Sequence, residues 1–131
     1  MKLNLDFIDL SPASGRLDSA AAIPYDYIEE DAQRMTVMKR LSEAGCRKDV
    51  KSLAAEVADR FGRLPPQALR LFRIAELRAA AAAASIGHID VKGDRAVFYR
   101  PDGRDIAFVG TLKGKSADGK LKDLFSFVRR I

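Results

Sequence analysis

The feature that most constrains the fold is a long segment, residues 66–85, that is apolar on nearly every side. It begins after Pro65 with Pro66, and proline is favoured in the first turn of a helix, where its missing N–H has no helical partner to lose. Its apolar side chains are Leu69, Leu71, Phe72, Ile74, Leu77 and the alanines from 79 to 84. A helix that is apolar all round has to be covered by other parts of the chain. We therefore expect a helix over residues 66–85 in the middle of the domain.

Two amphipathic helices are expected before this segment. Over residues 30–44 the apolar side chains recur at helical spacing, at Met35, Met38, Leu41 and Ala44. Over residues 48–61 they form a single stripe, at Val50, Leu53, Ala54, Val57 and Phe61. Gly62 follows this stripe and suits the positive φ that often ends a helix. Each of the two helices should bury one face and expose the other.

The remaining segments have the patterns of strands and turns. Residues 2–8 alternate like a half-buried strand, residues 9–22 suit a loop, and residues 22–28 suit an extended segment because Pro24 disfavours helix. Hairpin turns are expected at residues 92–94 and 102–103, then a mobile glycine-rich segment at 110–119 and an amphipathic helix up to Ile131. The sequence thus predicts a single α+β domain over residues 1–131: a strand, a three-helix segment, a small antiparallel sheet and a C-terminal helix.

The composition narrows the range of functions. The chain has 131 residues, with one cysteine, one histidine and no tryptophan. Cys46 has no partner for an internal disulfide, which fits a reducing compartment, and no segment reaches the ~18 consecutive apolar residues of a membrane helix. Catalytic sites that combine several cysteines or histidines are nearly excluded. We therefore expect a monomeric cytoplasmic binding module that is no enzyme, holds no metal or cofactor and does not contact membranes.

Charge is distributed unevenly along the chain. Residues 1–69 carry 10 basic and 11 acidic side chains, and residues 70–131 carry 13 and 7, which gives net charges of −1 and +6. A basic surface attracts nucleic acid. The basic segments at 113–122 and 129–130 therefore leave a second hypothesis open, that the chain is a nucleic-acid-binding module. The same side chains also suit a solvated surface that has no partner.

One stretch imitates a phosphate-binding loop. Residues 110–116 end in Gly114-Lys115-Ser116, the Gly-Lys-Ser of that motif. The motif needs another glycine five residues before its second glycine. Val109 occupies that position, so the sequence predicts no nucleotide site here.

Two carboxylates lie opposite the apolar stripe of the helix expected over residues 48–61. At 100° per residue, Glu56 and Asp59 are neighbours on the outer face, together with Ser52 and, if the helix continued, Arg63. Arg60 borders the stripe and can pair with Glu56 four residues back. Spacing alone fits a solvated face with weak ion pairs as well as a binding surface.

Two motifs relate these residues to a known family. Ile23-Pro24 and Tyr27-Ile28 precede, by about thirty residues, the sequence Glu-Val-Ala-Asp-Arg-Phe-Gly-Arg-Leu-Pro at 56–65. Further matches are Arg34, Lys39-Arg40-Leu41, Leu77-Arg78 and Ile86. Over residues 2–92 the chain resembles the C-terminal domain of bacterial transcription-repair coupling factor. Met38, where that family usually has an aromatic residue, and the alanine run at 79–84 depart from the pattern.

The resemblance implies a regulatory function. The parent protein of that family is an ATP-driven DNA translocase that displaces stalled RNA polymerase and recruits the A subunit of the excision nuclease. None of its motor motifs occurs in this chain, so the resemblance implies a non-enzymatic piece of a larger protein. In that family the C-terminal domain docks on the parent's own N-terminal domain, which resembles the excision nuclease B subunit, covers the surface for the A subunit and restrains the motor.

The resemblance also implies roles for individual residues. The docking surface would consist of Glu56, Asp59, Ser52 and Arg63. The structural part of the motif would consist of Pro24, Tyr27, Arg60, Phe61, Gly62 and Pro65. Whether the basic half of the chain contacts DNA once the domain is released stays open.

Overall fold

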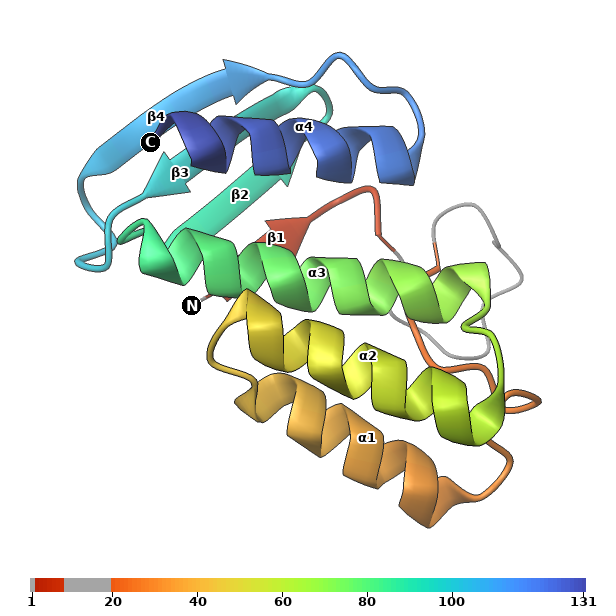
Figure 1. Ribbon diagram of the computed structural model, residues 1–131. Coiled ribbons are helices and arrows are strands. Elements are labelled where there is room, and N and C mark those ends of the chain that lie inside the picture. The colour runs from red at the N-terminus through yellow and green to blue at the C-terminus, as the bar shows by residue number, and fades with distance from the viewer. Residues whose placement is uncertain (1, 9–19) are drawn as a thin grey trace. The chain divides into compact units, whose positions relative to one another are not determined.

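The structure is a computed structural model that describes residues 2–8 and 20–131. Its elements are β1 (Lys2–Leu5), α1 (Asp31–Glu43), α2 (Arg47–Phe61), α3 (Pro66–Ala83), β2 (His88–Lys92), β3 (Arg95–Tyr99), β4 (Ile106–Thr111) and α4 (Ala117–Arg130) (Figure 1). This order confirms the predicted α+β fold class. Most of the loop predicted at 9–22 lies outside the described residues.

The chain forms two compact units that share one helix. The sheet unit contains β1 and everything from Leu77 to Ile131, and the helical unit ends at Glu76. α3 therefore begins in the helical unit and ends in the sheet unit. That the whole chain is a single domain stays a prediction.

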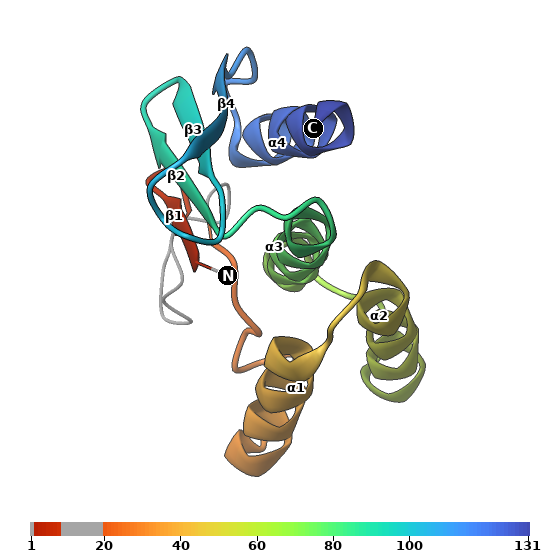
Figure 2. The ribbon, with the colours of Figure 1, turned by 90° about the vertical axis from the view of Figure 1, so that its left-hand side faces the viewer.

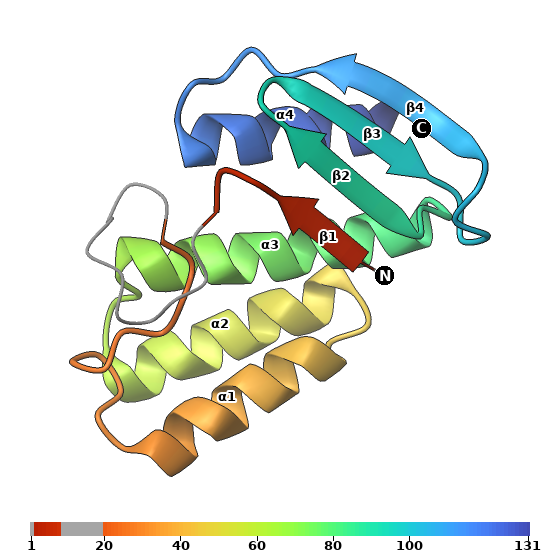
Figure 3. The same ribbon diagram turned by 180° about the vertical axis from the view of Figure 1, so that it is seen from behind.

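The four strands form one mixed sheet in the order β1-β2-β3-β4 (Figure 3). β2, β3 and β4 are antiparallel, with Asp90 opposite Val97 and Val97 opposite Val109. They are the small antiparallel sheet that the sequence predicts. β1 adds a parallel edge strand, with Leu3 opposite Ile89. Local patterns do not reveal this pairing because the two strands are far apart in the sequence.

Both predicted hairpin turns are confirmed. Gly93 follows β2 directly and has a φ of 61°, a left-handed conformation that glycine adopts without steric cost. In the second turn the carboxylate of Asp102 accepts hydrogen bonds from the backbone N–H groups of Arg104 and Asp105, at 2.8 and 3.0 Å. These bonds lower the pKa of Asp102 because they favour its charged form.

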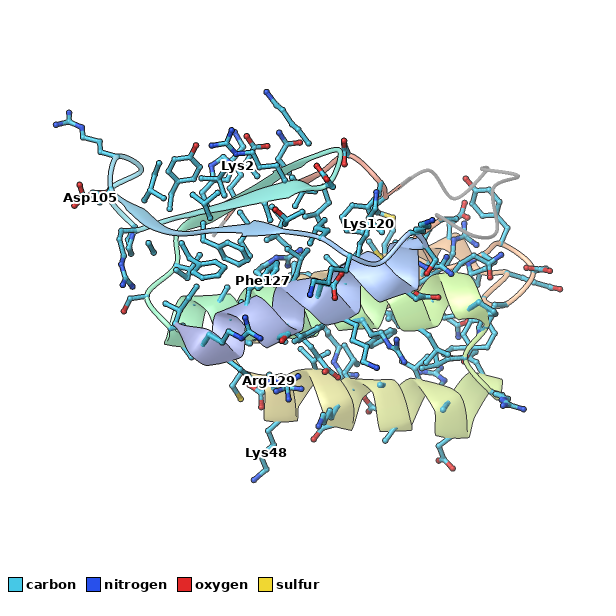
Figure 4. The ribbon with its side chains drawn as sticks, turned by 90° about the horizontal axis from the view of Figure 1, so that it is seen from above. Lys2, Lys48, Asp105, Lys120, Phe127 and Arg129 are labelled. Atoms are coloured by element: carbon cyan, nitrogen blue, oxygen red, sulfur yellow. The ribbon has the colours of Figure 1, made fainter. Side chains whose placement is uncertain are left out.

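α4 covers one face of the sheet (Figure 2). Phe127, labelled on this helix in Figure 4, packs against Phe98 and Phe108, with ring centroids 6.1 and 5.2 Å away. Leu121 and Leu124 of the same helix are buried. The predicted amphipathic C-terminal helix is thus confirmed, although Ile131 lies beyond its end and is 37% exposed.

The prediction of a mobile segment at 110–119 is wrong. β4 extends into this segment, and the next residue, Leu112, is buried, with its N–H donating to the carbonyl of Asp94 at 2.6 Å. Ser116 then caps α4, because its hydroxyl accepts a hydrogen bond from the N–H of Gly119. Both ends of the segment are therefore held by defined contacts.

Asp123 of α4 holds the middle of this segment. Its carboxylate accepts hydrogen bonds from the N–H groups of Lys113 and Gly114, at 2.9 and 2.7 Å. These amides belong to the stretch that imitates a phosphate loop, so an acidic side chain of the chain itself occupies them. The glycine content that suggested mobility instead permits close packing. A Cβ on Gly114 would lie 2.5 Å from the backbone carbon of Gly119.

In the helical unit, α1 and α2 lie side by side (Figures 1 and 3). The predicted buried face of α1 is partly wrong. Leu41 is buried as expected, but its buried neighbour is Val37, while Met35 and Met38 are 71% and 43% exposed. Val37 and Leu41 are one turn apart and form a narrower stripe than the methionines suggest. Spacing could not distinguish the two faces because both repeat at helical intervals.

The other two helices bury the faces that the sequence predicts. α2 buries its stripe at Val50, Leu53 and Val57. The buried residues of α3 lie around most of its circumference and are Ala68, Arg70, Leu71, Phe72, Ile74, Ala75, Leu77, Ala79 and Ala81. α3 ends at Ala83, slightly before the predicted end, because Ser85 takes a positive φ of 61°.

The close approach at Gly114 gives a first testable prediction. Gly114→Ala should lower the free energy of unfolding by about 1–3 kcal/mol, because the added methyl group forces two backbone segments apart. Urea unfolding followed by circular dichroism measures this change. Gly45→Ala is the matched control: a Cβ there meets nothing within 4 Å, so the variant should be as stable as the wild type or up to about 1 kcal/mol more stable. Equal stability of the two variants would contradict the packing described for residues 110–119.

Candidate docking surface

The outer face of α2 carries the side chains that the resemblance assigns to docking. Ser52, Glu56 and Asp59 are exposed on this helix, and Arg63 is exposed directly after Gly62. The spacing of 100° per residue therefore predicted the outward orientation of the two carboxylates correctly. Arg63 was placed on this face on the condition that the helix continued, but it lies beyond the end of α2. Two carboxylates about one turn apart thus project into solvent from one rigid element.

Glu56 pairs with a different arginine from the one predicted. Its carboxylate lies 2.5 Å from a guanidinium nitrogen of Arg40 on α1. Arg60, the predicted partner, instead lies over the ring of Phe61, with its guanidinium carbon 5.2 Å from the ring centre. Helical spacing predicts only neighbours along the same helix, so it could not predict a pair between Glu56 and an arginine of another helix. The one indication in the sequence was that Arg40 is among the residues that match the family.

The Arg40–Glu56 pair lines two hollows between α1 and α2. The first hollow has a volume of about 280 Å³, and its lining includes Val37, Val57 and Phe61. The second has a volume of about 560 Å³, and its lining includes Glu43, Asp49 and Ser52. Arg40 and Glu56 line both. The surface therefore combines exposed carboxylates with two open hollows between the helices.

Tyr27 connects the two halves of the family motif. Its hydroxyl donates a hydrogen bond to the carbonyl of Gly62 at 2.6 Å. Its ring packs edge-to-face with the ring of Phe61, with the two ring centroids 6.2 Å apart. Gly62 has a φ of 94°, as predicted, and its N–H donates to the carbonyl of Ala58 at 2.9 Å. Partial burial raises the pKa of Tyr27 because it disfavours the charged tyrosinate. The end of α2 is thereby fixed to the segment before α1.

Residues 24–28 form a turn, and the extended segment predicted here is wrong. The carbonyl of Pro24 accepts hydrogen bonds from the N–H groups of Tyr27 and Ile28, at 3.1 and 3.3 Å. Proline restricts the residue before it and not those after it, so the prediction carried the extended conformation too far. The turn places the Tyr27 ring where it reaches α2.

Arg34 attaches this turn to α1, and its role was missed in the sequence. Its guanidinium donates to the carbonyls of Ile28 and Glu29, at 2.6 and 3.0 Å, and pairs with the carboxylate of Asp31. The same group lies 4.5 Å from the ring centre of Tyr25. Arg34 thus fixes the start of α1 as Tyr27 fixes the end of α2.

Phe61 and Pro65 complete the structural part of the motif. Phe61 is half-buried, so the expectation that it completes the buried stripe of α2 is wrong. Its truncation should cost less than the about 3–5 kcal/mol typical of a fully buried phenylalanine. Pro65 precedes α3, and its carbonyl accepts the N–H of Leu69 at 2.9 Å, which closes the first turn of that helix.

Two further side chains with reactive groups, Cys46 and His88, are not among the residues assigned to docking. Cys46 is exposed at the N-cap of α2. The ring of His88 packs against the ring of Tyr99, with the ring centroids 5.4 Å apart. Residues 2–8 and 20–131 contain no group of three or more side chains of the kinds that bind metals. Within the same residues, no helix combines the length and hydrophobicity that crossing a bilayer requires.

Tyr27→Phe tests whether the hydroxyl holds the end of α2. The variant removes only the bond to the Gly62 carbonyl, so the free energy of unfolding should fall by about 0.5–1.5 kcal/mol. Tyr25→Phe is the control, because Tyr25 is 52% exposed, and its stability should stay within about 0.5 kcal/mol of the wild type. Thermal or urea unfolding measures both variants, and equal losses would contradict the assignment.

The raised pKa of Tyr27 gives the same bond a pH dependence. The folded state holds the phenolic proton more tightly than the unfolded state, so deprotonation opposes folding. This stabilisation should be complete below about pH 10, the ordinary tyrosine pKa, and should be lost as the pH rises beyond it. Tyr27→Phe should remove that part of the alkaline loss of stability, as unfolding at a series of pH values will measure.

Three comparisons relate the chain to known proteins. The sequence profile of the TRCF domain family matches residues 17–109. The transcription-repair-coupling factor of Mycobacterium tuberculosis is 40% identical over 58 residues, which cover 44% of this chain and 5% of that protein. The corresponding protein of Haemophilus influenzae is 30% identical over 87 residues, which cover 66% of this chain and 8% of that protein. The matched region is thus a small part of these curated relatives.

The fold comparison agrees with the sequence comparisons. The crystal structure of a C-terminal domain of transcription-repair coupling factor superposes with a TM-score of 0.68 and 16% sequence identity. The match covers 98% of this chain and 93% of that one. At this identity the likeness establishes the fold, and the profile match over residues 17–109 establishes the family. The chain therefore belongs to the TRCF domain family.

Proposed function

We propose that this chain is a regulatory docking domain. It binds the N-terminal domain of its own parent protein, which resembles the excision nuclease B subunit, and covers the surface that recruits the A subunit. In the same state it restrains the DNA-translocating motor until RNA polymerase is engaged. The observation that carries the proposal is the pair of exposed carboxylates, Glu56 and Asp59, on the outer face of α2. The domain acts in this proposal by binding and performs no catalysis.

The proposed contact is a charged latch. Carboxylates fixed on α2 meet basic side chains of the partner domain, and such charge-assisted hydrogen bonds are stronger than neutral ones. Exposed ion pairs contribute only about 0.2–1 kcal/mol each and are screened by salt. Because both domains belong to one chain, a high effective concentration compensates for this weakness. A contact of moderate strength therefore suffices to keep the parent closed.

The binding free energy of a typical partner is large enough to open a latch of this kind. Reversing a closed-to-open ratio from 99:1 to 1:99 needs about 5.5 kcal/mol of differential binding. RNA polymerase and DNA, if they bind the open parent better than the closed one, supply energy of this order. The rigid attachment of α2 through Tyr27 and Gly62 matters here, because a mobile helix would lose entropy on docking and weaken the latch.

A nucleic-acid-binding function is the second candidate, and the charge of the sheet unit favours it. Lys113, Lys115, Lys122, Arg129 and Arg130 are exposed there. DNA binding by the isolated chain over a salt series separates the two functions. Tight binding with a steep salt dependence would support this candidate, and weak binding would support the latch.

The latch predicts that Glu56→Ala with Asp59→Ala affects regulation and hardly affects folding. Both side chains are exposed, so the double variant leaves no cavity, and the unfolding free energy of the chain should change by no more than about 1 kcal/mol. In the intact parent the same change removes the acidic side of the contact. Affinity for the A subunit and basal ATPase activity should both rise, as binding and ATP-hydrolysis assays of the parent will measure.

Two results would contradict this prediction. A large loss of stability in the double variant would mean that the carboxylates are structural. Unchanged recruitment and ATPase activity in a stably folded parent would mean that the outer face of α2 is merely solvated. Lys48→Ala with Lys51→Ala is a control on the same helix: both lysines are exposed, and their loss should not open the parent.

A further inference from the structure

The Arg40–Glu56 pair bears directly on how the docking surface works. Its two side chains come from different helices, lie 2.5 Å apart and keep 51% and 56% of their surface exposed. Among the described residues no ion pair is found for Asp59, the second carboxylate of this face. A basic side chain that approaches from outside therefore meets one carboxylate directly and another that an arginine of the chain itself already occupies.

We infer that Arg40 stands in for the partner's basic side chain while the domain is undocked. On docking, an arginine of the partner replaces Arg40 at Glu56, and Arg40 turns away. This inference rests on the proposed function, since it describes the regulation of the same surface. Arg40 then competes with the basic side chain of the partner for Glu56, and this competition weakens docking.

The two hollows beside the pair give this exchange the room it needs. Both are lined by Arg40 and Glu56, so the pair stands at their common border. The second hollow also presents Glu43 and Asp49, and this negative charge attracts an incoming cation. The first presents Val37, Val57 and Phe61, against which the aliphatic stem of a long basic side chain packs.

The exchange also has a consequence for selectivity. An exposed ion pair holds its partners weakly, so a well-oriented guanidinium that makes two hydrogen bonds can displace Arg40. A single ammonium group with poor geometry gains little, because it must give up the existing pair to bind. Arg40 thus favours partners that present a fixed arginine over general basic surfaces.

The test is the affinity of this chain for the separately expressed N-terminal domain of its parent, measured by calorimetry at low ionic strength. Arg40→Met removes the competitor and should tighten binding about two- to fivefold, the range that an exposed ion pair can contribute. Lys39→Met is the matched control: it removes an exposed positive charge from the same helix, and no ion pair of Lys39 is found among the described residues. Its effect should be smaller, and thermal unfolding checks that each variant is folded.

Testing Arg40→Met in a chain that already carries Glu56→Gln shows whether Arg40 acts through Glu56. Glu56→Gln should weaken binding, and Arg40→Met added to Glu56→Gln should have no further effect beyond that of Lys39→Met. Arg40→Lys, which keeps the charge but loses the forked geometry, should fall between wild type and Arg40→Met. It also serves as the readout if Arg40→Met is poorly folded.

The possible outcomes separate the inference from the function on which it rests. If wild type does not bind, or Glu56→Gln binds as well as wild type, the proposed function fails and the exchange fails with it. If Glu56→Gln weakens binding but Arg40→Met behaves like Lys39→Met, only the exchange is overturned. If Arg40→Met weakens binding, Arg40 itself contacts the partner, which also overturns the exchange.

Discussion

The hydrogen bond from the Tyr27 hydroxyl to the Gly62 carbonyl joins the two segments on which the docking surface depends. At 2.6 Å it ties the turn that precedes α1 to the residue that ends α2. Gly62 can receive it because its positive φ, 94°, turns the chain out of the helix at that point. Arg34 anchors the same turn to α1 through the carbonyls of Ile28 and Glu29. With both helices fixed to one turn, the relative position of Arg40 and Glu56 follows.

The chemistry of the surface suits control better than permanent assembly. Its charged groups are exposed, so each contributes little free energy and responds to salt. A buried apolar interface would be stronger, but a binding partner of ordinary affinity would not release it. In the account proposed here, tethering supplies the strength of the contact and Arg40 supplies its selectivity. Stability and regulation are then carried by different residues of α2, since Val50, Leu53 and Val57 are buried while Glu56 and Asp59 are exposed.

The sequence was sufficient where the pattern is local. The stripe of α2, the outward carboxylates, the turn at Gly93 and the positive φ of Gly62 all depend on residues within a few turns of one another. It was insufficient where the deciding contact comes from elsewhere. The Arg40–Glu56 pair joins two helices, β1 pairs with a strand far along the chain, and Asp123 orders a segment whose composition suggested mobility. Met35 and Met38 show the same limit within one helix, because periodicity identifies an apolar face without identifying what covers it.

The most direct test of this account is a map of the docking surface on the chain itself. We expect that titrating the isotopically labelled chain with the N-terminal domain of its parent will shift NMR signals of the outer face of α2, around Ser52, Glu56, Asp59 and Arg63, together with Arg40 on α1. Signals of α4 and the sheet should change little, and added salt should reverse the shifts. Shifts centred on the basic residues of α4, or no shifts on α2 under conditions where the two domains associate, would contradict the account.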